Sequence, residues 1–408
     1  MPHASFAEKQ RFLLKLGRML HRFGTPAYRL EGHLQEVAQI LGIQASFAVS
    51  PTLLTFVTQE PGETHEHVHV ARVLPGELDL GSLSRTDEVV EAVARGGLGL
   101  DAAMARLEAI EAMPNPYGRA LSLAAFAGAG AAFALLMRCS WANVGWAALL
   151  STLVYAFVCW AEASSRITRM LEPLVALVSA LVATALAAAV DPGLQVPMVV
   201  LSSIIVFIPG LALTLGFAEL AARQVMSGTG RVMDGAMLLF KLYFGAFLGI
   251  ALGHRLFGKV ADPGPAQLPA WSSWLAVAAL CAALVVVFRA RPRHAPWGIL
   301  SGFIGYGASL LGAALLGPAL GAFVGAFLVG LYGNVFSRVS GVPASIVTLQ
   351  GMIVLVPGSK TYMGLNALIS GERMVATGQL GQDSFLIFMS LVAGFIFSLV
   401  LLPPRKSL

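Results

Sequence analysis

Two apolar segments of the sequence are interrupted near their middle by a Pro-Gly pair. Residues 202–214 read SSIIVFIPGLALT, and residues 350–361 read QGMIVLVPGSKT. Proline lacks a backbone donor and clashes with the preceding turn, and glycine adds backbone freedom, so each pair interrupts a helix. In lipid, the freed backbone groups must bond to protein or to water in a cavity. Matching interruptions in two halves of a chain predict a transporter's binding site, although a packing kink would explain either break alone.

The polar residues beside these breaks are the candidates for substrate binding. Half-helix N-termini attract carboxylates and half-helix C-termini attract cations, so a zwitterionic amino acid could use both. The alternative is that each serine or threonine bonds to its own helix backbone or to a neighbouring helix. The predicted substrate-binding residues are Ser202, Ser203, Pro209, Gly210, Thr214, Gln350, Pro357, Gly358, Ser359, Lys360 and Thr361.

Ionisable residues inside apolar segments form a second group of candidates, because burying a charge in a membrane is costly. Lys360 follows the second break, where it could bind a substrate carboxylate. Glu219 and Lys241 are the candidates for proton coupling. Each has a structural alternative: Glu219 could pair with Arg223 four residues later, and Lys241 could extend to the inner membrane surface. Asn334 could contact substrate or cap a helix.

The run His65-Glu66-His67-Val68-His69 is a candidate metal site, since strand alternation would put three imidazoles on one face. Metal sites usually collect ligands from more than one element, so we predict exposed hairpin residues and no bound metal. The sequence has no nucleophile elbow, phosphate-binding loop or zinc motif. No catalytic residue, cofactor or enzymatic activity is therefore predicted.

Composition indicates a membrane protein in contact with lipid. Hydrophobic residues make up 57% of the chain and charged residues 12%, against about 25% charged in soluble domains. Mean hydropathy is +0.75. The net charge of +5 comes from basic residues scattered at loop positions, which is typical of topology signals and does not indicate nucleic-acid binding.

The sequence changes character near residue 114. Helical spacing at 6–23 and 27–41, strand-like runs at 45–49, 53–58 and 68–74, and helical spacing at 87–95 and 100–113 predict a small α+β domain over residues 1–113. Beyond it, ten apolar stretches could each cross a membrane, which takes about 20 residues. They lie near 119–138, 141–161, 173–190, 196–226, 232–254, 272–290, 297–316, 318–336, 344–370 and 385–402.

The fourth and ninth stretches are too long for simple spans, and each contains one Pro-Gly break. This spacing predicts two five-helix repeats, residues 114–262 and 263–408. Because five is odd, the second repeat is expected to be inverted, with the site between the repeats. Basic residues favour an inner side shared with domain 1–113, so both termini are expected in the cytoplasm. The first hundred residues lack the apolar core of a signal peptide, which agrees with this orientation.

At several of these motifs the chain resembles the threonine/serine exporter family of bacteria, over nearly its whole length. In the soluble part the pattern is carried by LKLGRMLHRFGTPAYRLE at 14–31, PGELDL at 75–80 and ARLEAI at 105–110. In the membrane part it is carried by FIPGLALT at 207–214, ELA at 219–221, VPGS at 356–359 and LISG at 368–371.

The resemblance implies a cytoplasmic N-terminal domain, ten spans, and export of threonine and serine across the bacterial inner membrane, driven by the proton motive force. Some relatives split the two halves, fused here, into separate proteins linked to dicarboxylate export. Members often continue the second Pro-Gly-Ser with small or apolar residues, whereas this chain has Lys360, which favours a second carboxylate on the substrate.

Two alternatives stay open at this point. One is an exporter of dicarboxylates such as succinate, and the other, of a different class, is a membrane-anchored enzyme or sensor that acts through residues 1–113. The sequence does not decide the exact substrate, the coupling ion, the role of the N-terminal domain, or whether the chain forms a homo-oligomer.

Overall fold

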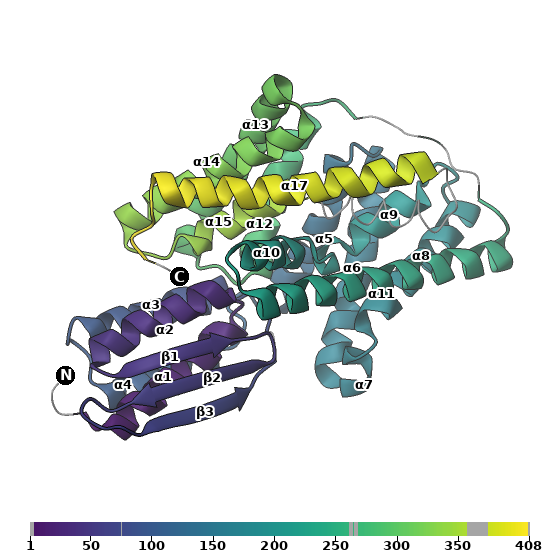
Figure 1. The fold of residues 1–408 in the computed structure, drawn as a ribbon. Coiled ribbons are helices and arrows are strands. Elements are labelled where there is room, and N and C mark those ends of the chain that lie inside the picture. Colours follow the sequence, from purple (N-terminus) through teal and green to yellow (C-terminus); the bar gives the residue numbers. More distant parts are fainter. Residues whose placement is uncertain (1–3, 75, 261–263, 265–267, 357–373, 407–408) are drawn as a thin grey trace.

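The computed structural model describes residues 4–74, 76–260, 264, 268–356 and 374–406. The N-terminal part has the expected order of two helices, a small sheet and two helices (Figure 1). Its elements are α1 (Phe6–Arg22), α2 (Ala27–Leu41), β1 (Gln44–Val49), β2 (Leu53–Gln59), β3 (Glu66–Arg72), α3 (Leu80–Ala94) and α4 (Leu100–Glu111).

In the membrane part, the regular secondary structure of the described residues is all helical. Its elements are α5 (Gly118–Leu136), α6 (Trp141–Ala163), α7 (Ser165–Thr168), α8 (Leu171–Ala189), α9 (Val196–Ser203), η1 (Ile205–Phe207), α10 (Gly210–Ala221), α11 (Val225–Phe257), α12 (Ser272–Val287), η2 (Pro292–His294), α13 (Ala295–Leu316), α14 (Pro318–Ser340), α15 (Ser345–Leu355) and α17 (Met374–Leu401).

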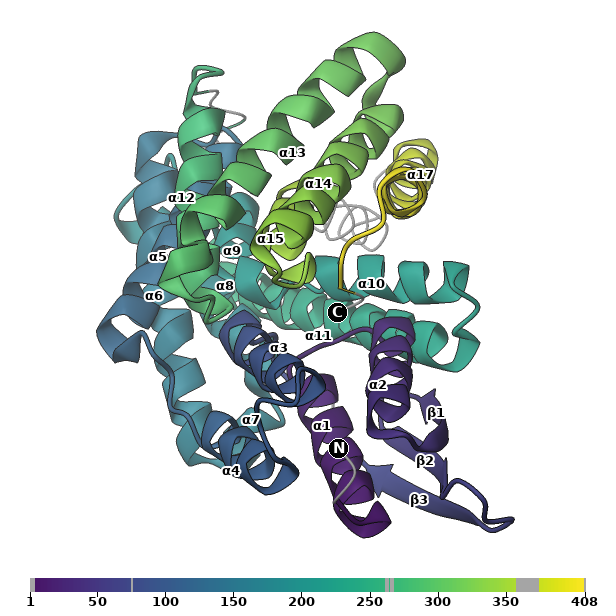
Figure 2. The same cartoon turned by 90° about the vertical axis from the view of Figure 1, so that its left-hand side faces the viewer.

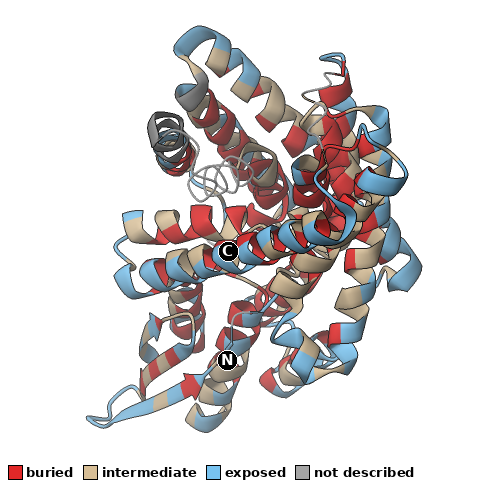
Figure 3. Cartoon of the chain, turned by 90° about the vertical axis from the view of Figure 1, so that its right-hand side faces the viewer, coloured by how far each residue is buried: buried red, intermediate tan, exposed pale blue. Residues whose placement is uncertain are grey.

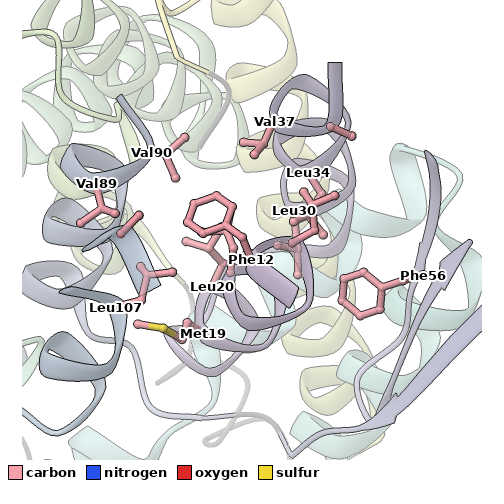
Figure 4. Packing of buried hydrophobic residues seen from close by; sticks show 14 of the residues in the cluster. Phe12, Met19, Leu20, Leu30, Leu34, Val37, Phe56, Val89, Val90 and Leu107 are labelled. Carbon is pink, nitrogen blue, oxygen red and sulfur yellow. The ribbon is translucent and has the colours of Figure 1, made fainter. Parts of the chain in front are cut away.

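Helix α1 forms the centre of the N-terminal α+β part, which we call the soluble domain after the prediction from its sequence. It begins at a capping box made by Ser5 and Glu8, and its apolar residues at helical spacing are buried, as predicted. Phe12 and Leu20 lie between α2 on one side and α3 and α4 on the other (Figure 4). The antiparallel sheet, in the order β1-β2-β3, covers α1 and α2 and contributes Phe56 to the same core.

Helix α3 begins earlier than the apolar spacing suggested. The expected start was residue 87, but the helix starts at Leu80, because the Asp79 side chain accepts a hydrogen bond of 2.7 Å from the Ser82 backbone and caps the first turn. The residues between contain serine and glycine, which are weak helix formers, so their helical state depends on this cap and on the contacts that Leu80 makes.

The polytopic class is confirmed in the part of the chain that the structure describes. Seven helices there are long and apolar enough to cross a membrane, and the bent pair α9 and α10 raises the number to eight. α12 and α15 are shorter apolar helices. The ten-span count and the inverted repeat stay predictions.

Many residues on the outer faces of the membrane helices are exposed (Figure 3), and large apolar residues are numerous among them. On α11, Phe240, Phe244 and Phe247 recur at helical spacing and are all about half exposed. A soluble protein rarely shows a continuous apolar surface of this kind, so these faces are suited to lipid.

Close helix packing inside this part depends on glycine. At Gly249 of α11, a Cβ atom would lie 2.3 Å from the Leu177 carbonyl oxygen of α8. At Gly321 of α14, it would lie 2.6 Å from the Ser309 carbonyl oxygen of α13. Any side chain at these positions would push the helices apart.

One buried histidine in the soluble domain carries a testable stability effect. His33 of α2 is 6% exposed, its Nε2 atom has no partner among the described residues, and its Nδ1 atom lies 3.9 Å from the Glu36 carboxylate. Burial, aided by the positive charge of Lys406, lowers the pKa of His33 to about 4.

Because the folded-state pKa lies below the unfolded value, His33 contributes stability above pH 6.5 that is lost as pH falls toward 4. As pH falls from 6.5 to 5, we expect the free energy of unfolding of the wild type to fall by up to about 2 kcal/mol more than that of His33→Gln. Thermal unfolding in detergent across that range measures this difference. The exposed His65→Gln variant is the control, and an equal shift in both variants would contradict the prediction.

Candidate functional site

The first Pro-Gly break divides its span as predicted. Helix α9 ends at Ser203, a short 3-10 turn follows, and α10 begins at Gly210 with a bend of 59° between the two parts. Pro209 occupies the N-cap position of α10 and has no N–H to continue the helix. The Leu213 N–H, 2.9 Å from the Pro209 carbonyl, makes the first helical bond of α10, so the Leu211 and Ala212 N–H groups have no partner within the helix.

A cavity of about 600 Å³ lies beside this break. One wall is formed by the break itself, from Ile205 to Ala212, and other walls come from α5, α12 and α13. Most lining residues are leucine, isoleucine, valine, alanine or phenylalanine. Its size and apolar walls with few polar groups are those of a small-molecule site.

The approach to the second break forms part of the same cavity. Helix α15 ends at Leu355, and Val356 adopts an extended conformation directly before Pro357. The last residues of this segment, Ile353 to Val356, line the cavity opposite the first break. The predicted residues Pro357, Gly358, Ser359, Lys360 and Thr361 lie outside the described residues.

The predicted serine and threonine residues of the first break donate their hydroxyl hydrogen bonds to backbone carbonyls of their own helices. The hydroxyls of Ser202 and Ser203 each donate at 2.7 Å, to the carbonyls of Met198 and Val200, and Thr214 donates at 3.0 Å to the Gly210 carbonyl. All three side chains are buried. Of the predicted residues that the structure describes, Gly210 is the one on the cavity wall.

Gln350 differs from these residues because its amide has no hydrogen-bond partner among the described residues. The side chain is 1% exposed and faces α13, where a Cβ atom at Gly298 would lie 1.6 Å from its Oε1 atom. The Ser301 hydroxyl on the same face of α13 is also buried without a partner in the described part of the chain. Ile353 on the cavity wall is one turn beyond Gln350 on α15. A polar ligand or a water molecule beside Gln350 and Ser301 would form hydrogen bonds with these polar groups, which are otherwise costly to bury.

Glu219 lies at the end of α10 farthest from the cavity and is fully buried. It pairs with Arg231 of α11 through two hydrogen bonds of 3.0 and 3.1 Å, and not with Arg223 as the spacing suggested. Its carboxylate also accepts from the Ser227 hydroxyl at 2.9 Å and from the Ala27 N–H at 2.9 Å. Since Ala27 is the first residue of α2, a membrane carboxylate caps a helix of the soluble domain.

The other singled-out polar residues lie away from the cavity. Lys241 of α11 is partly exposed, and its ammonium group lies 4.0 Å from the Glu172 carboxylate at the start of α8. Asn334 is buried and donates at 3.3 Å to the Ser398 carbonyl of α17, which joins α14 to α17.

The histidine run extends from the hairpin into β3. His67 packs its ring against Phe6, and His69 lies 3.0 Å from the Arg18 guanidinium, so both imidazoles face α1. No group of three metal-ligating side chains occurs among the residues that the structure describes.

Two polar residues of the cavity were not predicted. Tyr306 and Ser309 lie one turn apart on α13 and both line the cavity. The Ser309 hydroxyl donates at 2.9 Å to the Tyr306 carbonyl. The sequence signal for these residues is a tyrosine followed three residues later by a serine in an otherwise apolar, glycine-rich span. This span has no Pro-Gly break, so the search for interrupted spans does not select it.

Two family models match the chain. The model described as putative threonine/serine exporter matches residues 11–253, and the model described as Threonine/Serine exporter, ThrE matches residues 273–401. The first covers the soluble domain and the first Pro-Gly break, and the second covers the approach to the second break and α17.

Similarity over about nine-tenths of the chain extends to fungal proteins. An uncharacterized protein of Schizosaccharomyces pombe is 26% identical over 88% of this chain and 49% of its own length. The pheromone-regulated membrane protein 10 of Yarrowia lipolytica is 26% identical over 91% of this chain and 32% of its own length. The protein of the same name in Saccharomyces cerevisiae is 23% identical over 92% of this chain and 49% of its own length. The chain thus spans from about a third to a half of the length of these relatives.

No solved structure matches the chain. The two family models nevertheless cover both sides of the cavity and the soluble domain together. The chain belongs to the threonine/serine exporter family.

Proposed function

We propose that this protein is a secondary exporter that carries threonine and serine through the cavity between its two interrupted spans. The observation that carries the proposal is that this cavity is walled both by the first break, Ile205 to Ala212, and by the end of α15, Ile353 to Val356. Unpaired backbone groups next to a cavity are the means by which interrupted spans bind polar cargo in lipid.

In this proposal the substrate carboxylate binds at the start of α10. The N–H groups of Leu211 and Ala212 lack helical partners there, and the positive end of the helix dipole favours an anion. Tyr306 and Ser309 supply polar groups across the cavity for the ammonium or hydroxyl of the substrate. Gln350 and the predicted residues after Val356 complete the polar side of the site.

Proton coupling is assigned to Glu219, with Lys241 as the second candidate. Glu219 is the one carboxylate of the described membrane part that is fully buried. Protonation would remove the negative charge from its contacts with Arg231 and with the N-terminus of α2. A proton could in this way bias which arrangement of α10, α11 and the soluble domain is favoured.

The remaining parts of the proposal concern topology. We place the protein in the bacterial inner membrane, as the family resemblance implies, and both termini in the cytoplasm, on the basis of the loop charges. The two repeats, 114–262 and 263–408, are proposed to be inverted relative to each other, so that the site between them opens to one side at a time.

The first test is transport by the purified protein in inside-out vesicles. We expect threonine and serine to accumulate in the lumen under an imposed pH gradient that is acidic inside, because that direction corresponds to export. Radiolabelled uptake measures this, with protein-free vesicles as the control. Uptake no greater than in the control would refute the proposed function.

A dicarboxylate is the second candidate substrate because Lys360 follows the second break. The same vesicles distinguish the two by competition between serine and succinate. Inhibition of serine uptake by threonine but not by succinate supports the amino-acid exporter. Uptake of succinate that Lys360→Ala abolishes supports the alternative.

The proposed carboxylate contact is tested by removing one backbone donor. Proline is tolerated in the first turn of a helix, so Leu211→Pro deletes an N–H without preventing α10 from forming. We expect the KM for serine to rise about tenfold, since hydrogen bonds to a charged group contribute roughly 1.5–3 kcal/mol. Leu211→Ala is the control, because it shortens the side chain but keeps the N–H. Equal KM values for the two variants would contradict this contact.

The role of Glu219 is tested with Glu219→Gln, which keeps the shape of the protonated side chain. We expect exchange of labelled for unlabelled serine to continue while the pH gradient no longer drives accumulation. Asp234→Asn, an exposed change on α11, is the control. Normal gradient-driven accumulation by Glu219→Gln would exclude Glu219 as the proton carrier.

A further inference from the structure

One residue of the soluble domain is buried among the membrane helices. Leu80, the first residue of α3, is 0% exposed. It belongs to a cluster with Leu215 of α10, Val285 of α12, and Leu349 and Met352 of α15. The side chain therefore fills a space where three membrane helices meet.

The backbone at Leu80 and Gly81 also contacts the membrane part, at the residues that follow α12. The Leu80 N–H donates at 3.0 Å to the Phe288 carbonyl, which follows the last residue of α12. At Gly81, a Cβ atom would lie 2.4 Å from the Arg289 carbonyl oxygen, so no larger residue fits without separating the domain from the membrane part.

The cluster around Leu80 adjoins the cavity. Leu211, Phe288 and Val356 pack against the cluster and also line the cavity wall. These three residues come from the start of α10, the end of α12 and the approach to the second break. Leu80 thus packs against three residues of the cavity wall without lining the cavity itself.

We propose that the soluble domain is the inner plug of the transport path, with Leu80 as the side chain that blocks it. A substrate that enters from the side of the soluble domain reaches the cavity only after Leu80 has withdrawn. This inference rests on the proposed use of the cavity as the substrate site.

Ion pairs hold the plug to the second half of the membrane part. Acidic residues of the segment Glu77–Glu91 face basic residues of the loop after α12 and of the C-terminal tail, which ends beside α3 (Figure 1). The pairs are Arg289 with Glu77 and Asp79, Arg291 and Arg293 with Glu88, and Lys406 with Asp87 and Glu91.

A second set of contacts holds the domain to the first half. The Glu219 carboxylate caps α2 at Ala27, and the Gln224 amide donates to Glu31 on the same helix. Figure 2 shows α2 and α3 between the membrane helices and the rest of the domain. Since the domain contacts both halves, a rearrangement of one half against the other must break one of the two sets of contacts. Withdrawal of Leu80 is thereby tied to the motion that opens the cavity.

The test measures access to the cavity and needs no substrate. In a chain with Cys139, Cys159 and Cys281 changed to alanine, Val287→Cys places a thiol on the cavity wall. A charged, membrane-impermeant maleimide is added to inside-out vesicles on the side of the soluble domain. We expect slow labelling, and about tenfold faster labelling after Leu80→Ala, because truncation of a buried leucine favours the open state.

The matched control is Leu74→Ala, the same change at a leucine of this domain that is 73% exposed. Faster labelling with Leu80→Ala but not with Leu74→Ala supports the plug. Equal rates in both variants and in the parent overturn it, provided that Leu80→Ala elutes as a folded protein.

If Leu80→Ala does not fold, the plug is tested instead by the Glu88→Gln variant and by raising the salt concentration. The ion pairs of α3 are partly exposed, so raising KCl from about 50 to about 500 mM screens them. Labelling of the Val287→Cys thiol that accelerates with salt and in Glu88→Gln supports the plug, and labelling that responds to neither overturns it. Failure of the serine uptake assay leaves these labelling rates unaffected, so the two proposals fail separately.

Discussion

The architecture depends on one constraint: backbone groups in lipid must have partners, and Pro209 cannot supply a donor. The span from Val196 to Ala221 is therefore two helices joined at 59°. The start of α10, whose Leu211 and Ala212 N–H groups have no partner within the helix, lines the cavity, while the other end of the same helix carries Glu219 to the soluble domain. Helix α10 is only 12 residues long, so it connects the candidate site directly to the domain junction.

The contacts of Glu219 explain why α2, α10 and α11 assemble as a unit. A buried carboxylate is costly unless nearby donors replace its water, and here Arg231, Ser227 and the Ala27 N–H do so together. Removing any one donor leaves the charge partly uncompensated. The junction therefore joins the soluble domain to α10 and α11 through one shared carboxylate.

Prediction from sequence worked where local spacing decides structure. Apolar spacing indicated α1, the strand alternation and the first break, because each depends on neighbouring residues. It failed where partners come from distant segments. The spacing offered Arg223 as an alternative partner for Glu219, which instead pairs with Arg231, since the chain turns back between α10 and α11. Apolar spacing missed the first turns of α3, where the Asp79 cap and the contacts of Leu80 with α10, α12 and α15 take its place. Tyr306 and Ser309 are visible in the sequence as a polar pair, but their spacing does not show that a cavity lies beside them.

The attachment of Lys406 to α3 has a consequence for how the protein is made. A ribosome synthesises the soluble domain before the membrane part, and a domain with its own core can fold before the later segments emerge. Its docking partners Glu219 and Gln224 belong to the first half, but Arg289, Arg291 and Arg293 belong to the second half and Lys406 lies beyond α17. The full set of docking contacts can therefore form only after the last membrane helix has been synthesised.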